Sequence, residues 1–127
     1  MSANAKTVGT ELVNLCREGK GLEAISRLYA DDVVSVESAA APGFDKVTSG
    51  KPAVEAKSKF WAENTEVHSF EAEGPFPHGD EKFAVIFKID ATMKMANSRQ
   101  TLEEVGVYEV ANGKVVREEF FFNTPPQ

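Results

Sequence analysis

Helical and strand patterns occupy different parts of this chain, and their order limits the folds that it can adopt. Apolar residues recur at helical spacing over residues 5–18 and 22–30, with Gly19 and Gly21 between the two segments. From about residue 65 the spacing changes to the two-residue alternation of strands. Helices that precede consecutive antiparallel strands predict an α+β domain, in which the helices cover one face of a sheet.

A short strand over residues 33–38 and a third helix beginning near Pro52 lie between these two parts. Proline suits the first turn of a helix because its missing N–H has no intrahelical partner there. The loop from Ser38 to Gly50 is long for a compact domain. Long loops often cover binding sites, so this loop is a candidate lid.

The clearest strand and the clearest turn lie in the second half of the chain. The odd-numbered positions from Phe83 to Ile89 are all apolar, which predicts a long strand with two distinct faces. Asn112-Gly113 stands between two apolar runs and predicts a tight hairpin, since both turn positions need positive φ. Further strands are predicted over residues 65–74, 102–110 and 115–122.

Two predicted strands, residues 83–89 and 115–122, carry apolar residues on both faces. One face would pack on the helices, and the other needs a second cover. A partner subunit is the simplest cover, so we expect a homodimer through the outer face of the sheet.

Length and charge exclude several classes of protein. The chain has 127 residues, which is most simply one domain over residues 1–127. Its net charge of −6 argues against nucleic acid or an anionic membrane as partner. The first six residues do not resemble a signal peptide, and the single cysteine, Cys16, lies on an apolar helical face. These features predict a cytoplasmic protein in which Cys16 is a core residue.

Motifs for bound cofactors are not found in the sequence. The glycines are scattered among turns and do not form a phosphate-binding loop, and there is no Gly-x-Ser-x-Gly elbow. His68, His78 and Cys16 do not have the spacing of metal ligands. We therefore expect neither a cofactor nor a metal.

Two segments resemble a known family. They are the run from Glu18 to Val33, which contains Leu28-Tyr29-Ala30-Asp31-Asp32-Val33, and the closing run from Tyr108 to Phe122. Both resemble the SnoaL-like branch of the nuclear transport factor 2-like superfamily. The resemblance implies a cone-shaped, curved, mainly antiparallel (mixed) sheet wrapped around three helices, the cystatin-like fold. It also implies a deep apolar pocket for a small hydrophobic ligand, and dimers through the outer sheet face.

The same resemblance suggests a base. Counted from the Tyr-Ala-Asp-Asp run, Glu37 is similar in position to the aspartate that ketosteroid isomerases use as general base. A carboxylate over an apolar pocket can take a proton from carbon beside a carbonyl. Alternation along the strand suggests the opposite, because Val34 and Val36 look like core residues and Glu37 would then face solvent.

A donor that stabilises the enolate is the second requirement of such an enzyme. With one extra residue in the hairpin turn, Glu104 matches the acid that some isomerases use; without it, Val105 matches. The tyrosine donor of those enzymes, midway along the first helix, is replaced here by Leu12 or Val13. The resemblance therefore does not extend to steroid isomerase activity.

Other polar and aromatic residues are expected at the pocket. Those expected to contact a ligand are Tyr29, Lys57, Trp61, Glu118, Phe120 and Phe122. Lys57 interrupts an apolar helical face and could either pair with a pocket acid or reach water. Glu118 could be a pocket acid or an ion-pair partner, and Trp61 could equally be a core residue.

His68 is a third catalytic candidate, because histidine titrates near neutral pH and could move protons. A structural role is the alternative. His78 falls in the run 75–80, which predicts a turn. Two functions remain open: a cofactor-independent isomerase, cyclase or dehydratase acting on a small hydrophobic carbonyl compound, and a non-catalytic ligand-binding protein or dimeric scaffold.

Overall fold

The computed structural model describes residues 4–38 and 45–122. This part of the chain contains the helices α1 (Ala5–Arg17), α2 (Gly21–Leu28) and α3 (Lys51–Glu63). Its strands are β1 (Tyr29–Val36), β2 (Val47–Ser49), β3 (Thr65–His78), β4 (Lys82–Met93), β5 (Ser98–Ala111) and β6 (Lys114–Phe122). Within these residues, no helix has both the length and the apolar character needed to cross a membrane.

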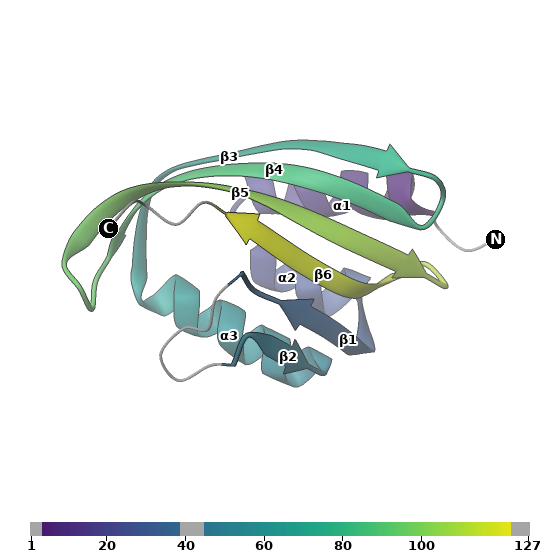
Figure 1. Ribbon diagram of the computed structural model, residues 1–127, viewed down its shortest axis with the longest axis horizontal. Helices are drawn as coiled ribbons and strands as arrows, with labels where there is room; N and C mark the ends of the chain where they lie inside the picture. The colour runs from purple at the N-terminus through teal and green to yellow at the C-terminus, as the bar shows by residue number, and fades with distance from the viewer. Residues whose placement is uncertain (1–3, 39–44, 123–127) are drawn as a thin grey trace.

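The strands form one curved sheet in the order β2-β1-β6-β5-β4-β3. Neighbouring strands are antiparallel except β1 and β6, which are parallel, so the sheet is mixed. The sheet arches over the helices: α1 packs on β3, α3 packs on β1, and α2 contacts both other helices (Figure 1). The predicted α+β fold, with a curved mixed sheet around three helices, is confirmed.

Local sequence explains where the elements begin and end. The Asn4 side chain accepts a hydrogen bond from the Thr7 N–H at 3.1 Å and caps α1. Gly50 has φ +91°, a backbone conformation that favours glycine, directly before α3. Asn112 and Gly113 have φ of 51° and 76°, which confirms the predicted hairpin between β5 and β6.

Several boundaries differ from the sequence prediction, and β4 and β5 are longer than predicted. Tyr29 begins β1 and does not end the second helix. Residues 75–78 continue β3, although they were predicted as a turn; β3 is an edge strand, where proline removes no bond of the ladder. The strand bends at a register shift between Glu73 and Phe76. In the candidate lid, β2 was not predicted because it is only three residues long, and residues 39–44 lie outside the described residues.

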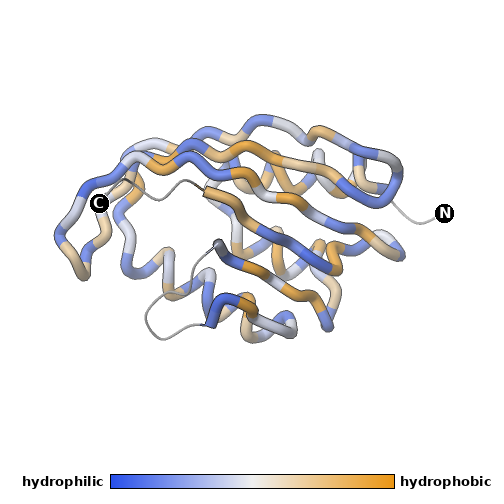
Figure 2. Tube along the Cα trace, viewed as in Figure 1, coloured by the Kyte–Doolittle hydropathy of each residue, from blue (hydrophilic) through white to orange (hydrophobic). Residues whose placement is uncertain are grey.

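The core lies between the helices and the concave face of the sheet. Val8 and Leu12 of α1 are almost fully buried, as are Phe83 and Val85 of β4. Each such side chain stabilises the fold by roughly 1.5–3 kcal/mol. Figure 2 shows apolar segments both along the strands and on the helices beneath them. This packing holds the helices against the concave face of the sheet.

Candidate active site

A cavity of about 810 Å³ lies between the three helices and the concave face of the sheet. Its size is within the range of small-molecule sites. The walls are mostly apolar and include Leu12, Val54, Trp61, Phe87, Phe120 and Phe122. The cavity therefore suits a small, largely apolar ligand.

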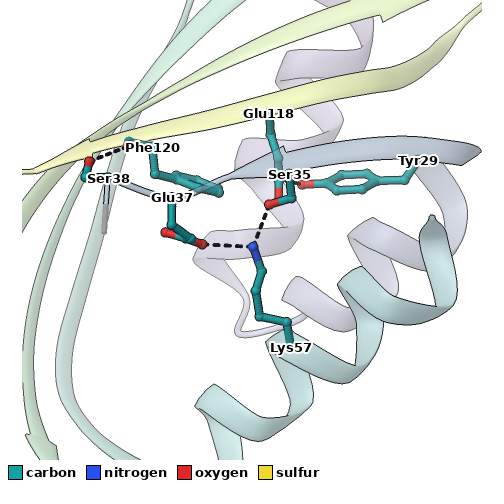
Figure 3. A network of polar contacts seen from close by, with 7 residues as sticks. All are labelled: Tyr29, Ser35, Glu37, Ser38, Lys57, Glu118 and Phe120. Atoms are coloured by element: carbon teal, nitrogen blue, oxygen red, sulfur yellow. Dashed lines mark hydrogen bonds and ion pairs between the residues drawn. The ribbon is translucent and has the colours of Figure 1, made fainter. Parts of the chain in front are cut away.

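Glu37 and Lys57 form an ion pair in the wall of this cavity. The Lys57 Nζ atom on α3 lies 2.9 Å from Oε1 of Glu37, which directly follows β1 (Figure 3). The Lys57 side chain is only 15% exposed and the Glu37 side chain 26%. The Glu37 N–H also donates to the Lys46 carbonyl at 2.8 Å, which fixes the backbone at this point.

The orientation of β1 decides where Glu37 points. Val33 and Ser35, which share a face with Glu37, are both 0% exposed. Alternation suggested a solvent-facing Glu37 because Val34 and Val36 look apolar, yet Val34 is only partly buried, and Val36, at 7% exposed, is less buried than Val33 or Ser35. The interior face is therefore that of Val33 and Ser35, and it leads directly to the cavity.

Glu118 on β6 lies deeper than Glu37. Its Oε2 accepts a hydrogen bond from the Ser35 hydroxyl at 2.6 Å, and its Oε1 accepts one from the Tyr29 hydroxyl. Lys57 Nζ donates to the Ser35 hydroxyl at 2.6 Å. These bonds join Tyr29, Glu118, Ser35, Lys57 and Glu37 into one network (Figure 3).

Glu104 on β5 also lines the cavity, between Phe87 of β4 and Phe122 of β6 in the sheet register. Burial raises the pKa of Glu104 to about 7, helped by the nearby charges of Glu37 and Glu118 and opposed by Lys57. Its neighbour Glu103 is exposed and pairs in register with Lys88. The cavity therefore holds one carboxyl group that keeps its proton in part at neutral pH.

Tyr108 supplies a second neutral donor. Its ring stacks on Phe83 at 4.8 Å and meets Phe120 edge-on. Its hydroxyl oxygen lies only 3.1 Å from the place that a Cβ on Gly106 would occupy, so the ring leans along β5 toward Glu104. Burial, with the charge of Glu118, raises the pKa of Tyr108 well above its usual range. The hydroxyl lines the cavity and has no hydrogen-bond partner among the described residues.

These groups combine different chemistries around one apolar hollow. Glu37 offers an ionised carboxylate next to an ammonium group. Glu104, which keeps its proton in part at neutral pH, and Tyr108 offer hydrogen-bond donors on β5, two strands away from β1 in the same sheet. Such a set can remove a proton from one atom of a bound molecule and donate a hydrogen bond to another.

The sequence matches the family model of the SnoaL-like domain over residues 3–122. The chain belongs to the SnoaL-like family. A comparison with curated proteins gave no match.

Solved structures agree with this SnoaL-like assignment. A protein from Mesorhizobium loti, described as a candidate SnoaL-like polyketide cyclase, is 38% identical with a TM-score of 0.84, over 90% of this chain and 95% of that one. A candidate isomerase from Bacillus subtilis is 19% identical with a TM-score of 0.73, over 91% and 84%. An NTF-2 like protein of unknown function from Burkholderia xenovorans is 18% identical with a TM-score of 0.67, over 94% and 83%. The last two show a shared fold.

His68 does not join the SnoaL-like cavity. Its side chain is exposed, and its Nε2 lies 2.7 Å from the Thr92 hydroxyl on β4. The neighbouring Val67 and Phe70 line the cavity, and a register shift between Val67 and Ser69 separates His68 from them. His68 is therefore not placed to act as the donor expected from the sequence.

The other residues expected at the pocket all lie in the cavity wall. Tyr29, Lys57, Trp61, Glu118, Phe120 and Phe122 line it. Tyr29 and Glu118 are hydrogen-bonded to each other, so their polar atoms belong to the buried network. Trp61 is 38% exposed and stands at the rim of the cavity.

Sequence reasoning missed Ser35 and Tyr108. Ser35 shares the face of Glu37, so a correct strand orientation would have found it. Tyr108 shares a face with Glu104 two positions beyond Gly106, and the same argument applies. Cys16 also lines the cavity, and burial, followed by the charge of Glu118, raises the pKa of its thiol to about 11. Across residues 4–38 and 45–122, no group of three His, Cys, Asp or Glu side chains is placed to hold a metal ion.

Proposed function

We propose that this protein is a cofactor-independent proton-transfer enzyme that isomerises, cyclises or dehydrates a small, mostly apolar carbonyl compound. Glu37 is the general base, and Glu104 and Tyr108 are the donors to the carbonyl oxygen. The observation that carries the proposal is the shared cavity: an ionised carboxylate and a carboxyl group with a pKa of about 7 line the same apolar hollow. Two carboxyl groups with different surroundings are typical of acid–base pairs.

The chemical step follows from these positions. The Glu37 carboxylate takes the proton from carbon next to the carbonyl, and the C–H electron pair forms the enolate. Glu104 and Tyr108 donate hydrogen bonds to the oxygen, where the negative charge gathers. Return of the proton to another carbon gives an isomer. Attack of the enolate carbon on a second carbonyl of the substrate breaks its C=O π bond and gives a ring, and the new alkoxide takes the proton from Glu37. Loss of a hydroxyl group from the next carbon, protonated as it leaves as water, gives the dehydrated product.

The cavity also indicates the class of substrate. Its wall is mostly apolar, and Arg17 and Lys20 line it as well as Lys57. Around Lys57, however, the carboxyl groups Glu37, Glu104 and Glu118 gather. A substrate carboxylate would be repelled beside these three carboxyl groups. An uncharged carbonyl compound is the best fit, and the cyclase and isomerase names of the M. loti and B. subtilis structures fall in the same reaction class.

The test is hydrogen exchange into small ketones. We expect the wild-type protein in D2O to place deuterium beside the carbonyl of at least one compound in a panel of small apolar ketones, read by mass spectrometry. Glu37→Gln keeps the shape and removes the base, so exchange should fall by about 10²- to 10⁴-fold. Glu103→Gln, which changes an exposed neighbour of Glu104, is the matched control and should keep the wild-type rate. Near-native exchange in Glu37→Gln would overturn the assignment.

A non-catalytic binding protein is the second candidate. Leu12, at the cavity wall, offers no donor where related isomerases have one, which favours this reading. Ketones that raise the melting temperature without any exchange would support a binder.

A further inference from the structure

Glu118 is a buried acid, and none of the cations in the described part of the chain bonds to it directly. It is 3% exposed, and Ser35, which binds it, is 0% exposed. Among the described residues, buried polar or charged side chains are limited to these two and Thr65. Burying an ionised carboxylate is costly unless its oxygens are well bonded. Two of the three buried polar residues therefore serve one contact, directly behind the proposed base.

The direction of the hydrogen bonds indicates the charge of Glu118. An ammonium group only donates, so Ser35 Oγ accepts from Lys57 Nζ at 2.6 Å. The Ser35 hydroxyl proton is then free to donate to Glu118 Oε2, also at 2.6 Å. Tyr29 donates to Oε1. Both oxygens of Glu118 act as acceptors, which is the pattern of an ionised carboxylate.

Lys57 is held between two acids by this arrangement. Its Nζ atom reaches Ser35, and through it Glu118, on one side and Glu37 at 2.9 Å on the other. Without the Ser35 contact, the flexible lysine side chain would have only Glu37 as a partner in the site. The position of the Glu37 carboxylate depends on where this ammonium group is fixed.

We propose that Glu118 is a positioning residue: as a buried anion held by Tyr29 and Ser35, it fixes Lys57 through Ser35 and so orients Glu37 toward the cavity. The consequence for catalysis rests on the proposed function; the positioning itself does not. Glu118 acts through other groups and needs no contact with substrate.

Among the titratable groups that act on Glu118, Lys57 is the cation. These groups are Cys16 from α1, Tyr29 and Glu37 from β1 and its end, Lys57 from α3, and Glu104 and Tyr108 from β5. Burial, with the charge of Glu37, raises the pKa of Glu118 on balance, and the hydrogen bonds from Ser35 and Tyr29 and the charge of Lys57 counter that rise. Removing either the charge or the Ser35 bridge should therefore release Lys57.

The experiment is NMR spectroscopy of the free protein, so it needs no substrate. The ¹⁵N-labelled ammonium group of Lys57 should show slow proton exchange in the wild type, because its protons are held by Ser35 and Glu37. We expect this signal to be lost in Glu118→Gln and in Ser35→Ala. Glu119→Gln is the matched control: Glu119 is the next residue of β6 and pairs with Arg117 at 3.0 Å, away from the network. It should keep the signal.

The titration of Glu104 is the second readout, one that a merely structural role would not move. The charge of Glu118 contributes to the raised pKa of Glu104. In Glu118→Gln the Glu104 midpoint should fall by roughly one pH unit, as expected for loss of a nearby like charge. Either an unchanged Lys57 signal or an unchanged Glu104 midpoint would overturn the proposal. Should Glu118→Gln fail to fold, the Lys57 signal in Ser35→Ala, which lacks a single oxygen atom, decides alone.

Discussion

Glu104 shows how one residue can be tuned by its surroundings. Burial is the main cause of its raised pKa, and Glu37 and Glu118 add to it. The group therefore holds its proton in the folded protein at pH values where the unfolded chain has lost it. A raised pKa of this kind stabilises the folded state below the unfolded pKa of 4.5, and that contribution is lost as pH rises through about 7.

Glu104→Gln should therefore flatten the pH dependence of stability. Above pH 7 the variant should be more stable than the wild type by roughly 1–3 kcal/mol, since each pKa unit corresponds to about 1.36 kcal/mol. Near pH 4.5 the two should be similar. Urea unfolding at pH 5 and pH 8 measures this, with Glu103→Gln as the exposed control. Parallel pH curves for Glu104→Gln and wild type would show that Glu104 is not tuned by burial.

At this scale the sequence located some site residues but not their contacts. Position along the family motif placed Glu37, and composition of the third helix singled out Lys57. Ser35 looked like an ordinary strand serine, because its role depends on Glu118, 83 residues away in the chain. The prediction for His68 failed for a similar reason. The face of β3 on which His68 lies depends on a local register shift, which the sequence pattern does not indicate.

At the scale of elements, α1 packs unusually closely on the sheet at Gly9. A Cβ added to Gly9 would lie 2.7 Å from Cβ of Pro75 and 3.0 Å from the Phe83 ring. Only glycine lets α1 approach β3 and β4 this closely. The contact in turn sets the distance of Leu12 and Cys16 from the cavity.

Gly9→Ala should destabilise the protein by roughly 1–3 kcal/mol, the usual cost of overpacking. Gly21→Ala is the control, since nothing lies within 4 Å of a Cβ there. Chemical denaturation of both variants measures the difference. Equal free energies of unfolding for Gly9→Ala and Gly21→Ala would contradict a tight contact between α1 and the sheet.

Element type could be read from the sequence better than element length. The helical stripes and the Asn112-Gly113 turn carry local signals, and the structure confirms both. The extension of β3 through Pro75 and Pro77 carries none, because it depends on β3 being an edge strand. The parallel pairing of β1 with β6 is also a property of the whole sheet.

At the scale of the whole molecule, an apolar stripe is exposed on the outer face of the sheet. Ile86, Val105 and Phe121 lie side by side across β4, β5 and β6, and Phe121 is 49% exposed. Exposed apolar patches of this kind mark interaction sites. We expect this stripe to be the interface of a homodimer, in which it would be covered by its own copy.

Phe121→Glu should convert the dimer to a monomer without unfolding it, because the side chain is already half exposed in one chain. Light scattering coupled to size-exclusion chromatography gives the mass. Val47→Glu, at an exposed position on the edge strand β2, should leave the dimer intact. A monomeric wild type would contradict this expectation.

The central claim, that Glu37 and Glu104 act as base and donor in one cavity, is tested most directly by the pH dependence of ketone hydrogen exchange. The wild-type rate should fall as pH rises through about 7, where Glu104 loses its proton. Glu104→Gln, whose amide donates at every pH, should lose that fall, while Glu37→Gln should be slow throughout. A wild-type rate that stays level from pH 6 to pH 9, or a fall that persists unchanged in Glu104→Gln, would contradict the account.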